Sequence, residues 1–217
     1  MTRPAAFFDM DHTLLQCNTA SLWLRWLREH KEISLYRTLR AIGWLMQYKL
    51  SVLDMESVTE RAIAEMAGQS EDELVAKTRV FFTAQVLTAV APKAVAAVQR
   101  HRDEGHVMAI LSSSTPYMVE PLAAHLGIEH AICTRLNVSD GKFAGTHVRP
   151  ACYGEGKVHW AEEFASANGV DLGRSYFYTD SYSDLPMLQR VGMARVVNPD
   201  ARLKRHARRV GWDVDLW

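Results

Sequence analysis

The chain has 217 residues, and its 25 Lys and Arg balance its 25 Asp and Glu, which leaves a formal net charge of +0. A neutral chain has no global field that attracts nucleic acid or an acidic membrane surface, so we expect neither partner. Three cysteines form no disulfide framework, and no run of about 18 apolar residues predicts a membrane span. Asp9 precedes any apolar leader core, which predicts a cytoplasmic location, while the oligomeric state is left open.

Short apolar runs alternate with helical patterns over most of the chain. Strands are predicted at Ala5–Phe8, His106–Leu111, Ala131–Leu136, Ser175–Thr179 and Ala194–Val197. Proline near the start and glycine just past the end mark helices at Pro92–Glu104, Pro116–Leu126 and Lys157–Asn168. This alternation predicts an α/β fold, a Rossmann-like doubly wound parallel sheet with helices on both faces. Asp140-Gly141 in NVSDGKFAG also predicts a small projecting hairpin.

Residues 17–88 are different, because they contain no convincing strand. Trp23 and Trp26 lie with neighbouring leucines on one apolar stripe, and the helical pattern continues in SLYRTLRAIGWLMQYKL at 34–50. SVTE at 57–60 and SEDE at 70–73 both match the capping box that starts a helix. We therefore predict an all-helical cap at 17–88, inserted after the first strand of a core formed by 1–16 and 89–217.

Two segments have a second interpretation. Arg25, Arg28, Arg37 and Arg40 lie near the tryptophan stripe, which is also compatible with a membrane-surface helix, although packing in a helical bundle is favoured. The C-terminal ARLKRHARR is interpreted as the solvated face of a last helix rather than a nucleic-acid patch.

FFDMDHTLL at positions 7–15 places Asp9 and Asp11 two residues apart, directly after an apolar run. Residues i and i+2 of a strand point the same way, and doubly wound sheets bind ligands at their carboxyl edge. Two carboxylates this close raise one pKa unless a positive group lies between them. By itself the motif also fits a simple turn, in which Asp is common.

Hydroxyl groups end the next strand. Ser112, Ser113 and Ser114 follow VMAIL, and Thr115-Pro116 opens a helix. Hydroxyls beside the free amides of a helix start suit an anion. Simple N-capping by Ser114 or Thr115 accounts for part of this run but leaves Ser112 free for a ligand.

Two further segments add charge. Lys157 lies at a helix start, where a cation opposes the helix dipole, and Gly154 and Gly156 indicate a bend that aims its ammonium group. Asp180 ends a strand, and Asp184 four residues later is also an N-cap candidate.

If these strand ends are adjacent, one pocket holds the carboxylates of Asp9, Asp11, Asp180 and Asp184 with the ammonium group of Lys157. That set is negative, and a hard divalent cation with oxygen ligands neutralises it. Mg²⁺ is the usual choice where a phosphate completes the coordination shell. The sequence therefore predicts a site for Mg²⁺ and a phosphoryl group.

With DMDHT at 9–13, the Ser112 strand end, Lys157 and TDSYSD at 179–184 in this order, the chain resembles the haloacid dehalogenase superfamily. It is most similar to the phosphoserine phosphatase-like branch, subfamily IB, which has a helical C1-type cap. VEPLAAHLGI, CTRLNVSDGKFAG and YGEGK are similar to that branch as well. The resemblance implies a Mg²⁺-dependent phosphatase that hydrolyses a small-molecule phosphomonoester through an aspartyl-phosphate intermediate.

The resemblance also implies roles for the acidic residues of the first and last motifs. Asp9 would be the nucleophile, and Asp11 the general acid and then the general base. Asp9, the backbone carbonyl of Asp11, and Asp180 would bind Mg²⁺.

The resemblance also implies supporting roles for the remaining site residues. Ser112, Ser113 and Lys157 would bind the phosphate oxygens. Thr13 would brace the loop, and Asp184 would act on the metal directly, through water, or by orienting Lys157.

One position departs from the family pattern. Phosphoserine phosphatases have a glutamate at the start of the cap that binds the substrate ammonium group, and the matching residue here is Asn18. A neutral amide is a poor partner for an ammonium group, and Asn18 also fits an N-cap. Asn18 is therefore a candidate for substrate specificity, and histidinol phosphate or another alcohol-type phosphate fits as well as phosphoserine.

Two other functions remain open. A phosphotransferase would use the same intermediate and pass the phosphoryl group to an acceptor alcohol. A non-catalytic interaction module would keep the fold and bind partners through its tryptophan-rich cap.

Overall fold

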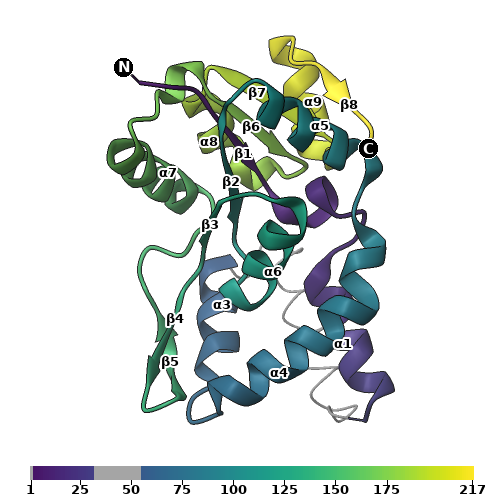
Figure 1. Ribbon diagram of the computed structural model, residues 1–217, viewed down its shortest axis with the longest axis vertical. Coiled ribbons are helices and arrows are strands. Elements are labelled where there is room, and N and C mark those ends of the chain that lie inside the picture. The colour runs from purple at the N-terminus through teal and green to yellow at the C-terminus, as the bar shows by residue number, and fades with distance from the viewer. Residues whose placement is uncertain (1, 32–54) are drawn as a thin grey trace.

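The core is a six-stranded sheet with the order β3-β2-β1-β6-β7-β8, and all of its strand pairs are parallel. Its strands are β1 (Ala5–Phe8), β2 (Val107–Ser112), β3 (His130–Cys133), β6 (Tyr176–Thr179), β7 (Met193–Val197) and β8 (Val214–Asp215). Figure 1 shows the computed structural model, which describes residues 2–31 and 55–217. Every residue of β1 and β2 is buried, as expected for strands covered on both faces.

Helices cover both faces of this sheet (Figure 1). Phe8 of β1 packs in one apolar cluster with α5 (Pro92–Asp103) and α6 (Pro116–Leu126). Phe7 packs in the other, with α7 (Glu155–Asn168), α8 (Leu185–Arg190) and α9 (Ala201–Val210). Neighbouring residues of β1 serve opposite clusters because successive side chains of a strand alternate faces. The predicted Rossmann-like doubly wound sheet is therefore confirmed.

The predicted ends of these strands and helices lie within two residues of the observed ones, apart from one strand. Ala131–Leu136 is two elements, because β3 ends at Cys133 and Leu136 begins β4 (Leu136–Ser139). β4 pairs antiparallel with β5 (Lys142–His147), and Asp140 and Gly141 between them have φ of 51° and 71°. Positive φ at both turn residues is typical of a tight hairpin, so the predicted hairpin is present.

The described part of 17–88 is helical. It contains α1 (Thr19–Glu29), α3 (Met55–Ala64) and α4 (Glu71–Phe81), followed by a π-helical turn at Phe82–Val86 and a short 3-10 helix at Leu87–Ala89. The pattern at 34–50, with Arg37 and Arg40, lies outside the described residues. The cap boundaries at 17 and 88 stay a prediction.

At one of the two predicted capping boxes, the helix start and its serine cap are confirmed. Ser70 is the N-cap of α4, and its side chain accepts a hydrogen bond from the backbone N–H of Glu73. The prediction for Ser57 is wrong, because α3 already runs from Met55 and Ser57 lies inside it.

The tryptophan stripe is part of the core. The Trp23 and Trp26 rings stack with centroids 5.2 Å apart, and each meets Phe81 edge-on, at 5.0 and 5.8 Å. Trp26 is only 6% exposed, so its ring is not offered to a membrane surface. Among the helices of residues 2–31 and 55–217, none has the length and apolar character needed to cross a bilayer.

The β4–β5 hairpin links these helices to the core. Phe143 of β5 and Leu136 of β4 form a buried cluster with Ile63 of α3. The N–H of Gly68 also donates to the carbonyl of Phe143 at 2.8 Å. Figure 1 shows the hairpin lying alongside α3, and α3 contacts β5, so this hairpin holds the helical segment against the rest of the chain.

Candidate active site

The site lies at the carboxyl ends of the three central strands of the sheet. β1 pairs with β2 on one side and β6 on the other, so that Phe8 is opposite both Ile110 and Tyr178. The N–H of Asp9 continues this pairing by donating to the carbonyl of Tyr178 at 2.9 Å. Asp9, Ser112 and Asp180 therefore leave adjacent strands at the same edge of the sheet.

Lys157 connects two of the predicted acidic residues. Its Nζ donates to Oδ1 of Asp9 at 2.8 Å and to Oδ2 of Asp184 at 2.7 Å. All three are buried, with exposed fractions of 2% for Lys157, 8% for Asp9 and 1% for Asp184. The structure thus brings together Asp9 and Asp184, which lie 175 positions apart in the sequence.

The two glycines before Lys157 set the path of the chain into α7. Gly154 has a φ of 53°, in the region that favours glycine. A Cβ on Gly156 would lie 1.9 Å from the carbonyl oxygen of Ala151, so only glycine permits this approach. The backbone therefore turns sharply enough to direct the first turn of α7, including Lys157, into the site.

Asp184 does not cap the helix that it precedes. It occupies the N-cap position of α8, yet its side chain makes no capping hydrogen bond. Its Oδ2 accepts instead from Lys157 and from the hydroxyl of Thr179, the latter at 2.6 Å. Thr179 was not predicted as a site residue, since its only sequence signal is a hydroxyl group at the end of a strand just before the acidic loop.

Asp11 is held by the start of α1. It lies in the turn at Met10–Leu14, directly after Asp9, where Asp11 has an extended backbone with φ of -69° and ψ of 138°. Oδ2 of Asp11 accepts from Nδ2 of Asn18 at 2.9 Å, and Oδ1 accepts from the N–H of Thr19 at 3.1 Å. Asn18 is also the N-cap of α1, because its Oδ1 accepts from the N–H of Ser21. The candidate for substrate specificity is therefore bonded to the candidate acid and base.

The hydroxyl residues have different surroundings. Ser112 is 3% exposed, and its Oγ accepts from the N–H of Ser114 at 3.2 Å. Ser113 is exposed, and Thr115 occupies the N-cap position of α6 without a capping side-chain bond. The hydroxyl of Thr13 is buried and has no hydrogen-bond partner among the described residues, so its predicted bracing role stays a prediction.

Burial dominates the electrostatics of the site. It raises the pKa of Asp9 to about 7, although the neighbouring Lys157 acts in the opposite direction. Burial, with the charges of Asp9 and Asp184, raises the pKa of Asp180 to about 8, and burial also raises that of Asp11. Burial lowers the pKa of Lys157, but Asp184 and Asp9 outweigh it and keep this ammonium group charged.

The donor set suits a hard divalent cation. Several carboxylates share one buried ammonium group, so the ionised site carries an excess of negative charge. Within the described residues, no other residue donates a hydrogen bond to the carboxylate of Asp180. A partly buried carboxylate of this kind, beside that of Asp9, fits an oxygen-ligated Mg²⁺.

Comparisons with known proteins agree with this architecture. The model of the haloacid dehalogenase-like hydrolase family matches residues 6–189. A histidinol-phosphatase of Neisseria meningitidis serogroup C is 29% identical over 214 residues, which cover 96% of each chain. Phosphoserine phosphatase SerB1 of Mycobacterium tuberculosis is 34% identical over 218 residues, covering 97% of this chain and 70% of that protein.

A solved structure supports the fold over the whole chain. It is described as a protein with unknown function from Bordetella pertussis Tohama I. It superposes with a TM-score of 0.90 at 29% sequence identity and covers 99% of both chains. The helical segment and the sheet therefore occur together in that protein as well.

Proposed function

This chain belongs to the haloacid dehalogenase-like hydrolase family, and on that premise we propose that it is a Mg²⁺-dependent phosphatase that uses an aspartyl-phosphate intermediate. Its substrate is a small-molecule phosphomonoester. Relatives that match nearly all of this chain are named as phosphatases, which supports this class of reaction. The predicted cytoplasmic location and the lack of a nucleic-acid partner stay predictions.

One observation carries the proposal. The ammonium group of Lys157 contacts the carboxylates of both Asp9 and Asp184 at the carboxyl edge of the sheet. A cation placed beside a carboxylate lowers the repulsion between that carboxylate and an incoming phosphate dianion. Lys157 therefore serves both the resting enzyme and the transition state, where charge develops on the phosphoryl oxygens.

In the first step, an oxygen of Asp9 attacks phosphorus. The bond from phosphorus to the ester oxygen breaks, and that oxygen leaves with the proton of Asp11 as an alcohol. Ser112 and Lys157 hold the non-bridging oxygens. The hydrogen bonds from Asn18 and Thr19 fix the carboxyl group of Asp11 beside the turn that follows Asp9.

In the second step, water attacks the phosphorus of the aspartyl-phosphate. Asp11, now ionised, takes the proton of that water, and the bond from phosphorus to Asp9 breaks to release inorganic phosphate. Its raised pKa suits Asp11 to both tasks, because it is able to hold a proton in the first step and accept one in the second.

Asp9, the backbone carbonyl of Asp11, and Asp180 are the residues that would hold Mg²⁺. The bound ion supplies positive charge that neutralises the phosphoryl oxygens and the nearby carboxylates. Asp184 contributes by holding Lys157, since its Oδ2 accepts both from that ammonium group and from Thr179.

The substrate class follows from the relatives and from Asn18. Histidinol phosphate and phosphoserine are the first substrates to test, because the relatives named for them match this chain over most of its length. The side chain of Asn18 is engaged with Asp11 and with the start of α1, so it is not positioned as a free partner for a substrate ammonium group. Histidinol phosphate and phosphoserine both carry an ammonium group, so Asn18 does not separate them, and an alcohol-type phosphate without an amine is the third candidate to test.

Phosphate release from a panel of phosphomonoesters, with and without Mg²⁺, tests the proposal. We expect turnover that a chelator removes and added Mg²⁺ restores, and a phosphorylated protein trapped at Asp9 after rapid acid quench. Transfer of the phosphoryl group to an added alcohol in place of water would identify a phosphotransferase. Absence of both turnover and Mg²⁺ binding by calorimetry would identify a non-catalytic module.

A further inference from the structure

The turn between α5 and β2 brings three metal-ligating side chains together within six residues. The N–H of His106 donates to the carbonyl of His101 at 3.0 Å, and the N–H of Gly105 donates to that of Arg102 at 3.1 Å. This nested pair is the Schellman motif that closes many helices, with Gly105 at a φ of 70°. The motif fixes the backbone of His101, Glu104 and His106, so their side chains start from a rigid frame.

The three donor atoms lie close to one another. Nδ1 of His101 is 2.8 Å from Nδ1 of His106, and Oε2 of Glu104 is 3.4 Å from His106 Nδ1 and 3.8 Å from His101 Nδ1. Two ligand atoms of a tetrahedral zinc site lie about 3.3–3.4 Å apart, because each is about 2.0–2.1 Å from the ion. Each of the three observed distances differs from that separation by about 0.5 Å or less. A small rotation of the imidazole rings removes this difference.

We propose that the α5–β2 turn binds a divalent transition-metal ion of the zinc class through Nδ1 of His101, Nδ1 of His106 and the carboxylate of Glu104. The fourth coordination position is open to water or an anion. Imidazole nitrogens with a single carboxylate suit zinc and its neighbours, whereas the all-oxygen set around Asp9 suits Mg²⁺. The two sites therefore select different metals.

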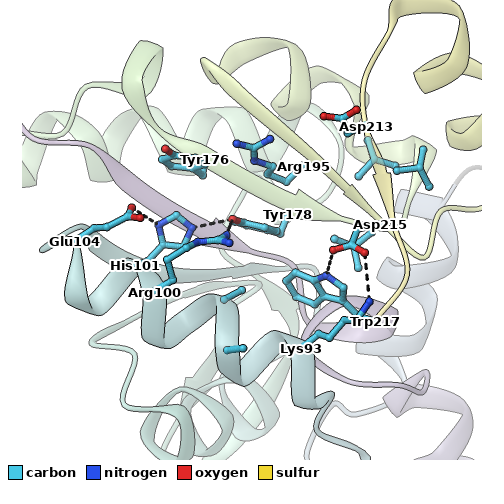
Figure 2. Close-up of a pocket in the computed structure, with 15 residues that line it drawn as sticks. Lys93, Arg100, His101, Glu104, Tyr176, Tyr178, Arg195, Asp213, Asp215 and Trp217 are labelled. Carbon is cyan, nitrogen blue, oxygen red and sulfur yellow. Dashed lines mark hydrogen bonds and ion pairs between the residues drawn. The ribbon is translucent and has the colours of Figure 1, made fainter.

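The second ring nitrogen of His101 already has the partner that a metal ligand needs. Its Nε2 is 2.8 Å from the hydroxyl of Tyr178, which also accepts from Nη2 of Arg100 at 2.7 Å (Figure 2). When His101 Nε2–H donates to that oxygen, the lone pair of Nδ1 is free to bind the metal. Such a partner fixes the tautomer and the orientation of a ligating imidazole.

The exposure of the turn allows an ion to enter. His101 is fully buried, but the Glu104 side chain is 45% exposed and forms the open side of the site. His101 and Glu104 line a cavity of about 890 Å³ that also contains Arg100 and Arg195 (Figure 2). Neither arginine has a carboxylate partner within the described residues. Their positive charges therefore repel a metal ion that has no anionic fourth ligand, and they favour an anion in that position.

This site is separate from the catalytic one. It precedes Val107 at the start of β2, whereas Ser112 ends the same strand at the catalytic edge. The intervening strand is about 16 Å long at its ordinary rise. Metal binding at the turn thus does not depend on the phosphatase mechanism.

Zinc titration of the full chain tests the inference. The protein is stripped with a chelator and held in excess Mg²⁺ so that the all-oxygen site is filled, and Zn²⁺ binding is measured by calorimetry. We expect one equivalent of Zn²⁺ to bind, with Co²⁺ giving the visible absorption of a four- or five-coordinate nitrogen and oxygen site. Imidazole NMR should place the Zn²⁺ shifts on Nδ1 of His101 and His106.

Variants then assign the ligands. His106→Gln and Glu104→Gln should each weaken Zn²⁺ binding at least tenfold, and the second changes an exposed side chain that the fold does not need. Tyr178→Phe should weaken it by about 10–100-fold, as loss of a partner to a ligating histidine does. His159→Gln, an exposed histidine on α7, and Asp180→Asn are the controls that should keep full affinity.

Three results would overturn the inference: no Zn²⁺ binding in excess Mg²⁺, full affinity in Glu104→Gln and His106→Gln, or loss of binding in Asp180→Asn. The last would place the ion at the catalytic carboxylates.

Discussion

The two ends of strand β2 carry two clusters of ionisable side chains that are built in different ways. At the carboxyl end, Asp9, Lys157 and Asp184 come from distant segments and meet as charged groups. At the other end, His101 and His106 come from one turn of six residues, and their Nδ1 atoms lie 2.8 Å apart. The first cluster exists only because the sheet forms, whereas the second is prepared by a local backbone motif.

The two clusters differ in whether an opposite charge compensates for burial. Burial raises the pKa of Asp9 to about 7 and lowers the pKa of His101 to about 4, because in each case it disfavours the charged form of the side chain. At the catalytic edge, Lys157 opposes this effect and keeps a charged pair in place. Next to His101, the nearby charges of Arg100 and Arg195 reinforce it. The carboxylate of Asp9 thus has a compensating charge, whereas a protonated His101 has none among the groups that shift its pKa.

The largest effect on turnover is expected at Asp9. Asp9→Asn should lower kcat by on the order of 10⁴-fold or more, because an amide cannot accept the phosphoryl group. The fold should remain, since the side chains are nearly the same size and Lys157 keeps Asp184. Phosphate release and circular dichroism measure the two quantities. Asp103→Asn on α5 is the matched control, and full activity of Asp9→Asn would remove Asp9 from the role of nucleophile.

Lys157→Ala should lower kcat by on the order of 10²-fold, the cost of losing one electrostatic contact to the transition state. It should also lower the free energy of unfolding by about 3–5 kcal/mol without Mg²⁺, because two buried carboxylates lose their counter-ion. Urea denaturation with and without Mg²⁺ measures this loss. Lys93→Ala, at an exposed ion pair, should cost no more than about 1 kcal/mol.

A decrease in kcat of less than twofold would place Lys157 outside the catalytic machinery. Such a result would also separate the structural effect of the ammonium group from any effect on the reaction.

Asn18→Ala tests whether Asn18 positions Asp11 or contacts the substrate. We expect a stability loss of about 1 kcal/mol from the missing helix cap and a decrease in kcat of roughly tenfold from a misplaced acid and base. Ser70→Ala removes a comparable cap from α4 and should leave kcat unchanged. An increase in KM for one substrate, with kcat preserved, would instead show that Asn18 recognises the substrate.

The smallest effect on turnover is expected at the other cluster. Tyr178→Phe removes the hydroxyl that meets Arg100 and His101, and should lower the free energy of unfolding by about 1–2 kcal/mol. The value of kcat should stay within twofold, because the ring remains and the backbone carbonyl still accepts from Asp9. Thermal unfolding and phosphate release check this, and a tenfold decrease in kcat would show that the two clusters are coupled.

The sequence by itself determined the class of the fold and identified most of the residues of the candidate site. Continuous apolar runs, prolines and glycines identify the strands and helices because these signals act over a few residues. Asp9 and Lys157 were recognised as chemically unusual at their positions, and the structure places them in contact. Local chemistry was sufficient there, because a charge at the unfavourable end of a helix or beside a buried strand lowers stability unless a partner or a ligand compensates for it.

Only the tertiary structure decided which partner each polar group has. It assigned Asp184 to Lys157 and Thr179 rather than to the end of a helix, and Asn18 to Asp11 as well as to α1. It also placed Tyr178 of β6 against His101 of α5, 77 positions apart in the chain. Hydrogen bonds and charge neutralisation depend on distance in space, and that distance is fixed by how the strands are ordered and how the helices pack on them.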